Sequence, residues 1–190
     1  KPQEGLEAFI RRVNPNLPPP AHVLPLLAAL ESINRGRLRL AVCMPPRHAK
    51  TITLRHFVAW LTVRFPKLVH AWISHTDDLA RQSSRAIRDH VLEAGMQLRS
   101  DAAALNEWHT TEGGGLIAAG IESGLVGKGI SGVLVMDDLV RNAEEADSAS
   151  AQEKIAEWLT RVALTRLEPG ASAVLSMHRW SDGDIGGRVI

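Results

Sequence analysis

A lysine and a threonine, Lys50 and Thr51, stand between residues 44–49 and an apolar helical pattern. An apolar run, residues 38–43, comes directly before them. A strand, a tight turn and a Lys-Thr pair that opens a helix form the layout of a phosphate-binding loop, in which backbone N–H groups point at phosphates. In such a loop the lysine reaches the β- and γ-phosphates and the hydroxyl holds Mg²⁺. The segment therefore predicts a nucleotide site.

The loop departs from the usual pattern G-x-x-x-x-G-K-[ST] at both glycines, because Met44 and Ala49 occupy those positions. Alanine has less backbone freedom than glycine, although it is the mildest such change. Taken alone, the segment is equally compatible with a plain strand-to-helix turn that carries one exposed lysine.

Two adjacent carboxylates, Asp137 and Asp138, follow the apolar residues 133–136 and supply the partner that a phosphate loop requires. We expect Asp137 to hold Mg²⁺ opposite Thr51, and Asp138 to position water or take its proton. Because ligands of open α/β sheets bind at the carboxyl ends of strands, the two motifs should lie side by side. Their combination favours a nucleotide site over a common strand-to-turn ending.

A third polar segment, residues 176–184, lies at the end of the apolar run 171–177 and includes His178, Arg179 and Trp180. A cationic group at a strand end could sense the γ-phosphate and report hydrolysis. The segment is equally compatible with a packed, solvated Arg-Trp pair.

Apolar strands separated by helical patterns predict a mainly parallel sheet covered on both faces. Residues 96–106 are ambiguous. Strands are expected at 38–44, 68–74, 133–136 and 171–177, with a hairpin of 107–111 and 116–121 around Gly113–Gly115. Helices are expected at 5–13, 22–34, 52–65, 77–94 and 151–164, and a further helix from 182. We expect a helical lead-in over 1–36 and an ATPase core over 37–190.

Composition sets further limits. The 190 residues suffice for one domain, and the net charge is +1. Eight Lys/Arg and no Asp or Glu occupy residues 32–76, which suits phosphate-bearing ligands. The single cysteine, Cys43, excludes an intramolecular disulfide and is expected to be buried in its strand. No run of about 18 apolar residues is present, so we expect no membrane partner.

Four segments, in this order, resemble motifs of the ATPase domain of the large terminase subunit of tailed bacteriophages. Residues 44–51 resemble that family's Pro-Pro-Arg-His-Gly-Lys-Ser/Thr loop, and residues 124–129 its Leu-Thr-Gly-Arg-Gly segment. Residues 135–140 resemble its Asp-Asp-Pro stretch. Residues 178–188 resemble its Thr-Arg-Trp-His-Glu-Asp-Asp-Leu-x-Gly-Arg coupling motif.

The resemblance implies an α/β P-loop NTPase of the ASCE type, built as a three-layer sandwich. It implies a Mg²⁺-dependent, ATP-hydrolysing motor that moves double-stranded DNA into a procapsid. The implied partners are DNA, the capsid portal protein, the small terminase subunit and further copies of the chain in a ring. The implied location is the host-cell cytoplasm. We expect the family's nuclease domain to be absent from this chain.

The resemblance also implies roles for individual residues. Arg47 would contact the γ-phosphate during hydrolysis, and Lys50 would neutralise charge on the β- and γ-phosphates. Lys128 stands where the family often has arginine and would reach a neighbouring subunit's ATP as a point charge. The implied nucleotide-binding residues are Pro46, Arg47, His48, Ala49, Lys50 and Thr51. The implied coupling residues are His178, Arg179 and Trp180.

Two other functions remain open. One is a different P-loop enzyme, such as a helicase-like DNA translocase. The other is a non-hydrolysing DNA-binding module with a degenerate loop, for which Ala49 and His178 are the best arguments, since glycine and threonine are usual there.

Overall fold

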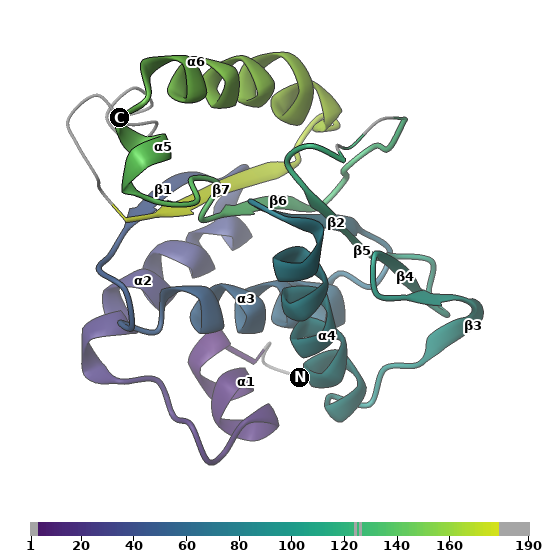
Figure 1. Ribbon diagram of the computed structural model, residues 1–190. Coiled ribbons are helices and arrows are strands. Elements are labelled where there is room, and N and C mark those ends of the chain that lie inside the picture. The colour runs from purple at the N-terminus through teal and green to yellow at the C-terminus, as the bar shows by residue number, and fades with distance from the viewer. Residues whose placement is uncertain (1–3, 124, 126, 179–190) are drawn as a thin grey trace.

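A seven-stranded sheet runs through the middle of the protein, with helices on both of its faces (Figure 1). The computed structural model describes residues 4–123, 125 and 127–178. The spatial order of the strands is β1-β7-β6-β2-β5-β4-β3. The strands are β1 (Arg39–Cys43), β2 (Val69–Ser74), β3 (Leu98–Ala104), β4 (Glu107–Thr110), β5 (Gly115–Gly120), β6 (Val133–Asp137) and β7 (Ser172–Met177).

The first five strands in this order are parallel, whereas β4 and β3 are antiparallel to their neighbours. The predicted mainly parallel sheet is therefore confirmed, as is the β4–β5 hairpin. The ambiguous residues 96–106 contain β3, the outermost strand. Most of its side chains are exposed, so it carries no apolar signal in the sequence.

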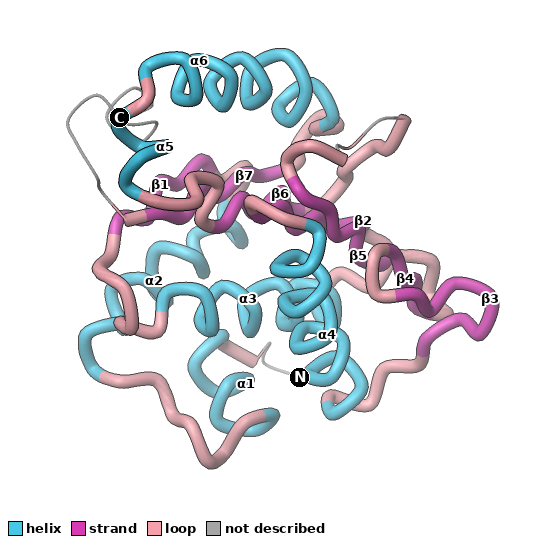
Figure 2. Tube along the Cα trace, in the orientation of Figure 1, coloured by secondary structure: helices cyan, strands magenta, loops and turns pink. Residues whose placement is uncertain are grey.

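Helices cover the two faces of the sheet as separate layers (Figures 1 and 2), which confirms the predicted sandwich. The first four helices cover one face and the last two cover the other. The α-helices are α1 (Leu6–Val13), α2 (Leu24–Glu31), α3 (Lys50–Arg64), α4 (Asp77–Glu93), α5 (Ala143–Asp147) and α6 (Ala149–Trp158). No helix in the described part of the chain is both long and apolar enough to span a membrane.

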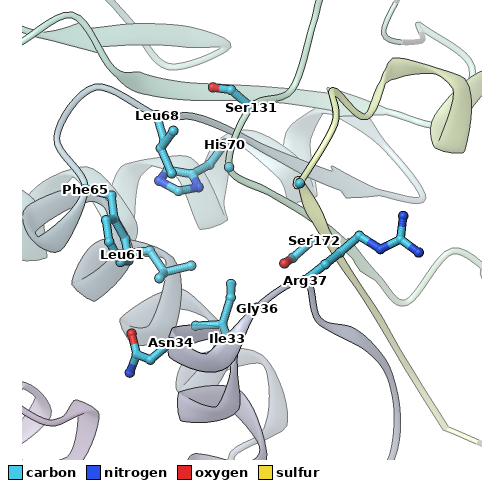
Figure 3. A pocket seen from close by; sticks show the side chains of 12 residues that line it. Ile33, Asn34, Gly36, Arg37, Leu61, Phe65, Leu68, His70, Ser131 and Ser172 are labelled. Atoms are coloured by element: carbon cyan, nitrogen blue, oxygen red, sulfur yellow. The ribbon is translucent and has the colours of Figure 1, made fainter.

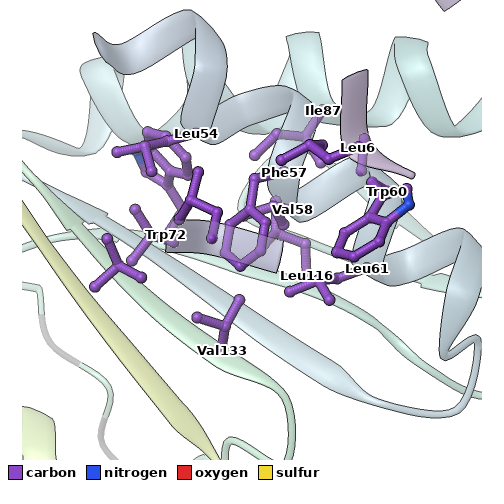
Figure 4. Packing of buried hydrophobic residues seen from close by; sticks show 14 of the residues in the cluster. Leu6, Leu54, Phe57, Val58, Trp60, Leu61, Trp72, Ile87, Leu116 and Val133 are labelled. Atoms are coloured by element: carbon purple, nitrogen blue, oxygen red, sulfur yellow. The ribbon is translucent and has the colours of Figure 1, made fainter. Parts of the chain in front are cut away.

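Successive residues of a strand point to opposite faces of the sheet, so they pack in different halves of the core. Trp72 and Val133 pack with Phe57 under the first layer (Figure 4), whereas Ile73 and Met136 pack under the second. Helix α3 is buried on most of its surface because it lies between the sheet and the other helices of its layer. This burial gives the loop before α3 a rigid support.

Three expectations need correction. The predicted helix 22–34 is divided among a 3-10 turn (Ala21–Val23), α2 and a second 3-10 turn (Ser32–Arg35), because Pro25 lacks an N–H group and fits only the first turn of an α-helix. The predicted helix 151–164 begins earlier, at Ala149, and ends in a π-turn (Leu159–Ala163) followed by a 3-10 turn (Leu164–Arg166). Cys43 is exposed rather than buried, because β1 is an edge strand of the described sheet and Cys43 lies at its end. The helix expected from residue 182 lies outside the described residues.

Candidate nucleotide-binding site

The loop between β1 and α3 has an unusual backbone. Arg47 and Ala49 both adopt left-handed conformations, with φ of 63° and 62°. Ala49 is thus in the conformation that favours glycine, at the position where the usual motif has one. Such a loop can turn successive N–H groups toward a common point and bind an anion there.

The amino end of α3 has no side-chain cap. By contrast, Thr76, Asn142 and Ser148 cap α4, α5 and α6 through their side-chain oxygens. The first N–H groups of α3 therefore keep their hydrogen-bonding capacity, and the helix dipole favours negative charge at that end. Both features suit a phosphate group.

The two predicted motifs meet at the carboxyl ends of the strands. Asp137, the last residue of β6, is 5% exposed, and its Oδ2 atom accepts a hydrogen bond of 2.8 Å from the Thr51 hydroxyl. Its Oδ1 atom accepts a bond of 2.6 Å from the Ser176 hydroxyl on β7. Both oxygens of the carboxylate are therefore held by hydroxyl groups from neighbouring elements.

Lys50 lies between the two carboxylates and is itself 5% exposed. Its Nζ atom is 2.5 Å from Asp138 Oδ1 and 4.0 Å from Asp137 Oδ1. The Nδ1 atom of His178 lies 3.5 Å from the same Asp138 oxygen. Asp138 has a φ of 49°, so its backbone is also left-handed as the chain leaves β6.

Burial dominates the electrostatics of Asp137. It raises the pKa of this carboxyl group, and the negative charge of Asp138 acts in the same direction. The hydrogen bond from Ser176 and the charge of Lys50 oppose the rise. Burial also lowers the pKa of the Arg55 guanidinium on α3, and the charge of Asp137 opposes this shift. A cation placed beside Asp137 would favour its ionised form.

The oxygens at this point suit a hard cation such as Mg²⁺. Mg²⁺ prefers hard oxygen ligands and is usually held by one or two carboxylates, substrate phosphates and water. Thr51 and Asp137 supply a hydroxyl and a carboxylate in contact with one another. The described residues contain no cluster of three or more His, Cys, Asp or Glu side chains that could hold a metal alone.

Ser176 belongs to the third polar segment of the sequence, but its contact with Asp137 was not predicted. It is fully buried and pairs in register with Asp137 across β6 and β7. Its only signal in the sequence is a polar residue near the end of an apolar run. That signal gains meaning only once β7 is known to lie between the loop strand and the acidic strand.

The remaining loop residues lie at the surface. Pro46, Arg47 and His48 are exposed, and the Nδ1 atom of His48 is 2.9 Å from the Pro46 carbonyl oxygen. The Nε2 atom of His22 lies 3.2 Å from the His48 carbonyl oxygen. A small apolar cavity of about 90 Å³ lies next to Ala49. Its lining includes Ile10, Leu17, Pro18, Pro19, Pro20, Ile52, Thr53 and His56.

Lys128 does not join this site within the chain. Its ammonium group pairs with Glu107 on β4, whose carboxylate also contacts His109. Four strands separate β4 from β1, or roughly 24 Å at the usual strand spacing. Arg179 and Trp180, two of the predicted coupling residues, lie outside the described residues.

A comparison with solved structures finds phage large terminases. The HK97 bacteriophage large terminase superposes on the whole chain with a TM-score of 0.62 at 16% sequence identity. The chain spans 40% of the length of that protein. The ATPase domain of the Thermus phage P74-26 large terminase aligns with 86% of the chain, over 71% of its own length, at 15% identity and a TM-score of 0.49.

The chain therefore has the fold of the part of the HK97 large terminase with which it aligns, and the fold expected from the motif resemblance is confirmed. No protein-family model matches the sequence. No curated protein matches it either.

Proposed function

We propose that this chain is an ATP-hydrolysing motor domain that drives double-stranded DNA into a viral procapsid. One observation carries the proposal. At one end of the sheet, beside the uncapped amino end of α3, four side chains come together: Lys50, Thr51, Asp137 and Asp138. The fold shared with the HK97 large terminase supports the packaging role.

In the proposed site the loop binds the phosphates of ATP. The N–H groups between Arg47 and Lys50 and the amino end of α3 bind phosphate oxygens, and the Lys50 ammonium neutralises charge on the β- and γ-phosphates. Thr51 and Asp137 would hold Mg²⁺. The bound ion would neutralise part of the phosphate charge. The base would lie toward Pro18–Pro20, beside the apolar cavity next to Ala49.

Binding of phosphate would also free the second carboxylate. Without a ligand, the Lys50 ammonium is paired with Asp138. A phosphate that attracts Lys50 weakens this pair and leaves Asp138 able to orient a water molecule and accept its proton. Water then attacks the γ-phosphorus, and the bond to the β-phosphate oxygen breaks, giving ADP and phosphate. Arg47 is an exposed residue of the loop and would contact the departing phosphoryl group.

Two further residues are proposed to act beyond the loop. Lys128 would complete the site of a neighbouring copy, which requires a ring of subunits and release from Glu107. His178, beside Asp138, would begin the segment with Arg179 and Trp180 that passes the nucleotide state to the DNA-gripping element. Portal protein, small terminase subunit and a procapsid in the host cytoplasm belong to the same proposal.

The two proposed segments of the chain share one hydrophobic core. We take residues 37–190 as the ATPase core and 1–36 as a lead-in. Leu6 and Phe9 of this lead-in are fully buried in the same cluster as Phe57 of α3. The lead-in therefore supports the loop helix.

The test is steady-state ATP turnover as a function of protein concentration. Lys50→Ala should abolish turnover, because it removes the ammonium group that lies beside both carboxylates and would neutralise the phosphates. Specific activity that rises with concentration in the wild type would support a residue contributed by a neighbour. Near-wild-type turnover in Lys50→Ala would refute the assignment.

A second comparison separates the proposed role of Lys128 from the loop. Lys128→Ala should lower turnover while leaving the affinity for Mg-ATP unchanged, because Lys128 does not touch the loop of its own chain. Glu107→Gln serves as the matched control, since it removes the ion pair but keeps the lysine. Equal losses in both variants would mean that the pair is only structural.

The two rival functions predict different results. A helicase-like translocase would hydrolyse ATP and move along DNA without any procapsid or portal. A degenerate DNA-binding module would show no Mg-ATP binding at any protein concentration.

A further inference from the structure

A second cavity lies at the opposite end of the sheet. It has a volume of about 360 Å³ and is bounded by residues at the amino ends of β2, β6 and β7 (Figure 3). Leu61 and Phe65 reach it from the carboxyl end of α3. Since α3 begins at Lys50 and rises about 1.5 Å per residue, roughly 22 Å separates this cavity from the loop. The two sites are therefore distinct.

His70 forms one wall of the cavity and is fully buried. Its Nδ1 atom accepts a hydrogen bond of 3.1 Å from the Val133 N–H group, so the proton of the neutral ring must be on Nε2. Burial lowers the pKa of His70 to about 4, which keeps the ring neutral. Nε2 has no hydrogen-bond partner among the described residues. Its ring extends toward Leu61 and Phe65 (Figure 3).

The backbone is adapted to this ring. A Cβ atom at Gly132 would lie 2.3 Å from His70 Nδ1, so only glycine allows the imidazole to occupy its place. A buried N–H donor without an acceptor costs free energy that an apolar side chain of similar size would not. An arrangement that fixes such a donor at a cavity wall points to an acceptor that comes from a ligand.

The other groups in the wall define the chemistry of that ligand. Ser131 and Ser172 each accept a backbone N–H hydrogen bond through Oγ, so each hydroxyl proton is left to donate. The rest of the wall is mainly apolar, and none of the residues that line it is acidic. Arg37 is at the rim, with its guanidinium turned away from His70 (Figure 3). The wall thus offers apolar surface and neutral donors.

We propose that this cavity binds a small, uncharged, mainly apolar molecule whose carbonyl-type oxygen accepts the Nε2 proton of His70. The ligand would fill the space between Leu61, Phe65 and Ser172, and its acceptor would give the buried donor its missing partner. This site is independent of ATP hydrolysis.

Two probes of the same shape test the proposal. Acetophenone carries a carbonyl acceptor, and α-methylstyrene replaces that oxygen by CH₂. Each is titrated into the isotope-labelled chain, and the NMR methyl signals of Ile33, Leu61 and Leu68 report binding. His70→Asn is the matched variant, because the amide oxygen can still accept from Val133 N–H while the Nε2 donor is lost.

The expected result is selective. Acetophenone should bind the wild type and lose about tenfold in affinity in His70→Asn, the usual effect of one neutral hydrogen bond. The affinity for α-methylstyrene should stay within about twofold, since it makes no such bond. Ile33→Trp, which fills the partly buried rim, should abolish the shifts from both probes.

Either of two results would overturn the proposal. One is the absence of any shift at these methyl groups up to the solubility limit of acetophenone. The other is an equal change in the affinities of both probes in His70→Asn, which would mean that the histidine only supports Val133 and shapes the wall.

Discussion

Removing a single hydroxyl group at the end of β7 tests how Asp137, the carboxylate proposed to hold Mg²⁺, is positioned. Ser176 is fully buried and donates a 2.6 Å hydrogen bond to Asp137 Oδ1. Ser176→Ala leaves this oxygen without its partner, while the bond from Thr51 to the other oxygen remains. The carboxylate is then free to rotate away from the loop.

The size of the effect follows from the type of bond. A hydrogen bond to a charged group contributes about 1.5–3 kcal/mol, and each 1.4 kcal/mol corresponds to roughly tenfold in affinity. The Mg²⁺ concentration for half-maximal turnover should therefore rise by about 10- to 100-fold, the range typical of residues that orient a metal ligand. The maximal rate should fall less, because Lys50 and Asp138 are unchanged.

The pH dependence supplies a second readout. The Ser176 bond lowers the pKa of Asp137 against the effect of burial, so its loss should raise that pKa further. Mg²⁺ binds the ionised form, and a proton competes for it as the pH falls through the raised pKa. The acid limb of the activity profile should therefore move to higher pH in Ser176→Ala.

Ser74→Ala is the matched control. Ser74 flanks Asp137 on the opposite side, in β2, and is also buried, but its Oγ atom accepts from the Trp72 indole. The assay is ATP turnover over a series of Mg²⁺ concentrations and pH values. Equal shifts in both variants, or an unchanged Mg²⁺ requirement in Ser176→Ala, would refute the idea that Ser176 positions Asp137.

Three further predictions concern strain, pH and exposure. Ala49→Gly should raise the free energy of unfolding by about 1 kcal/mol, since glycine removes the left-handed strain at φ of 62°; lower stability in denaturant titrations would contradict this. His70 has a folded pKa of about 4, below the unfolded value, so the unfolded chain binds more protons and stability falls as the pH drops below about 6.5. His70 should account for about 2 kcal/mol of the loss at pH 5, and a pH dependence left unchanged by His70→Asn would contradict this contribution. Cys43 should react with a thiol reagent in the native protein within seconds, as an exposed thiol does, and slow reaction coupled to unfolding would show that β1 is covered.

The contact between the two chemical motifs was predictable because both follow apolar strands. Parallel strands end at the same edge of a sheet, so Lys50 and Asp137 had to come close once both strands were recognised. The partner of Lys128 was not predictable in this way. It depends on β3 and β4, and β3 is an exposed edge strand without an apolar pattern. The exposure of Cys43 likewise depends on the position of β1 in the sheet.

The second cavity could not be found in the sequence for a related reason. His70 and Gly132 are 62 positions apart, and helix α4 and strands β3, β4 and β5 come between them in the sequence. Their contact arises from the register in which β2 and β6 pair, where Ala71 lies opposite Leu134. An alternating pattern fixes which face a residue occupies, but it does not fix which strand lies beside it.

The strain in the backbone argues against a degenerate loop. Among the described residues, Arg47, Ala49 and Asp138 are the non-glycine residues with positive φ, and all three lie at the candidate site. Each such conformation costs roughly 1–2 kcal/mol for a residue with a Cβ atom. A loop that had lost its ligand could relax to ordinary turn geometry without penalty. The strained residues lie together, beside the buried pair of Lys50 and Asp137. A phosphate site requires such an arrangement, whereas a plain strand-to-helix turn does not.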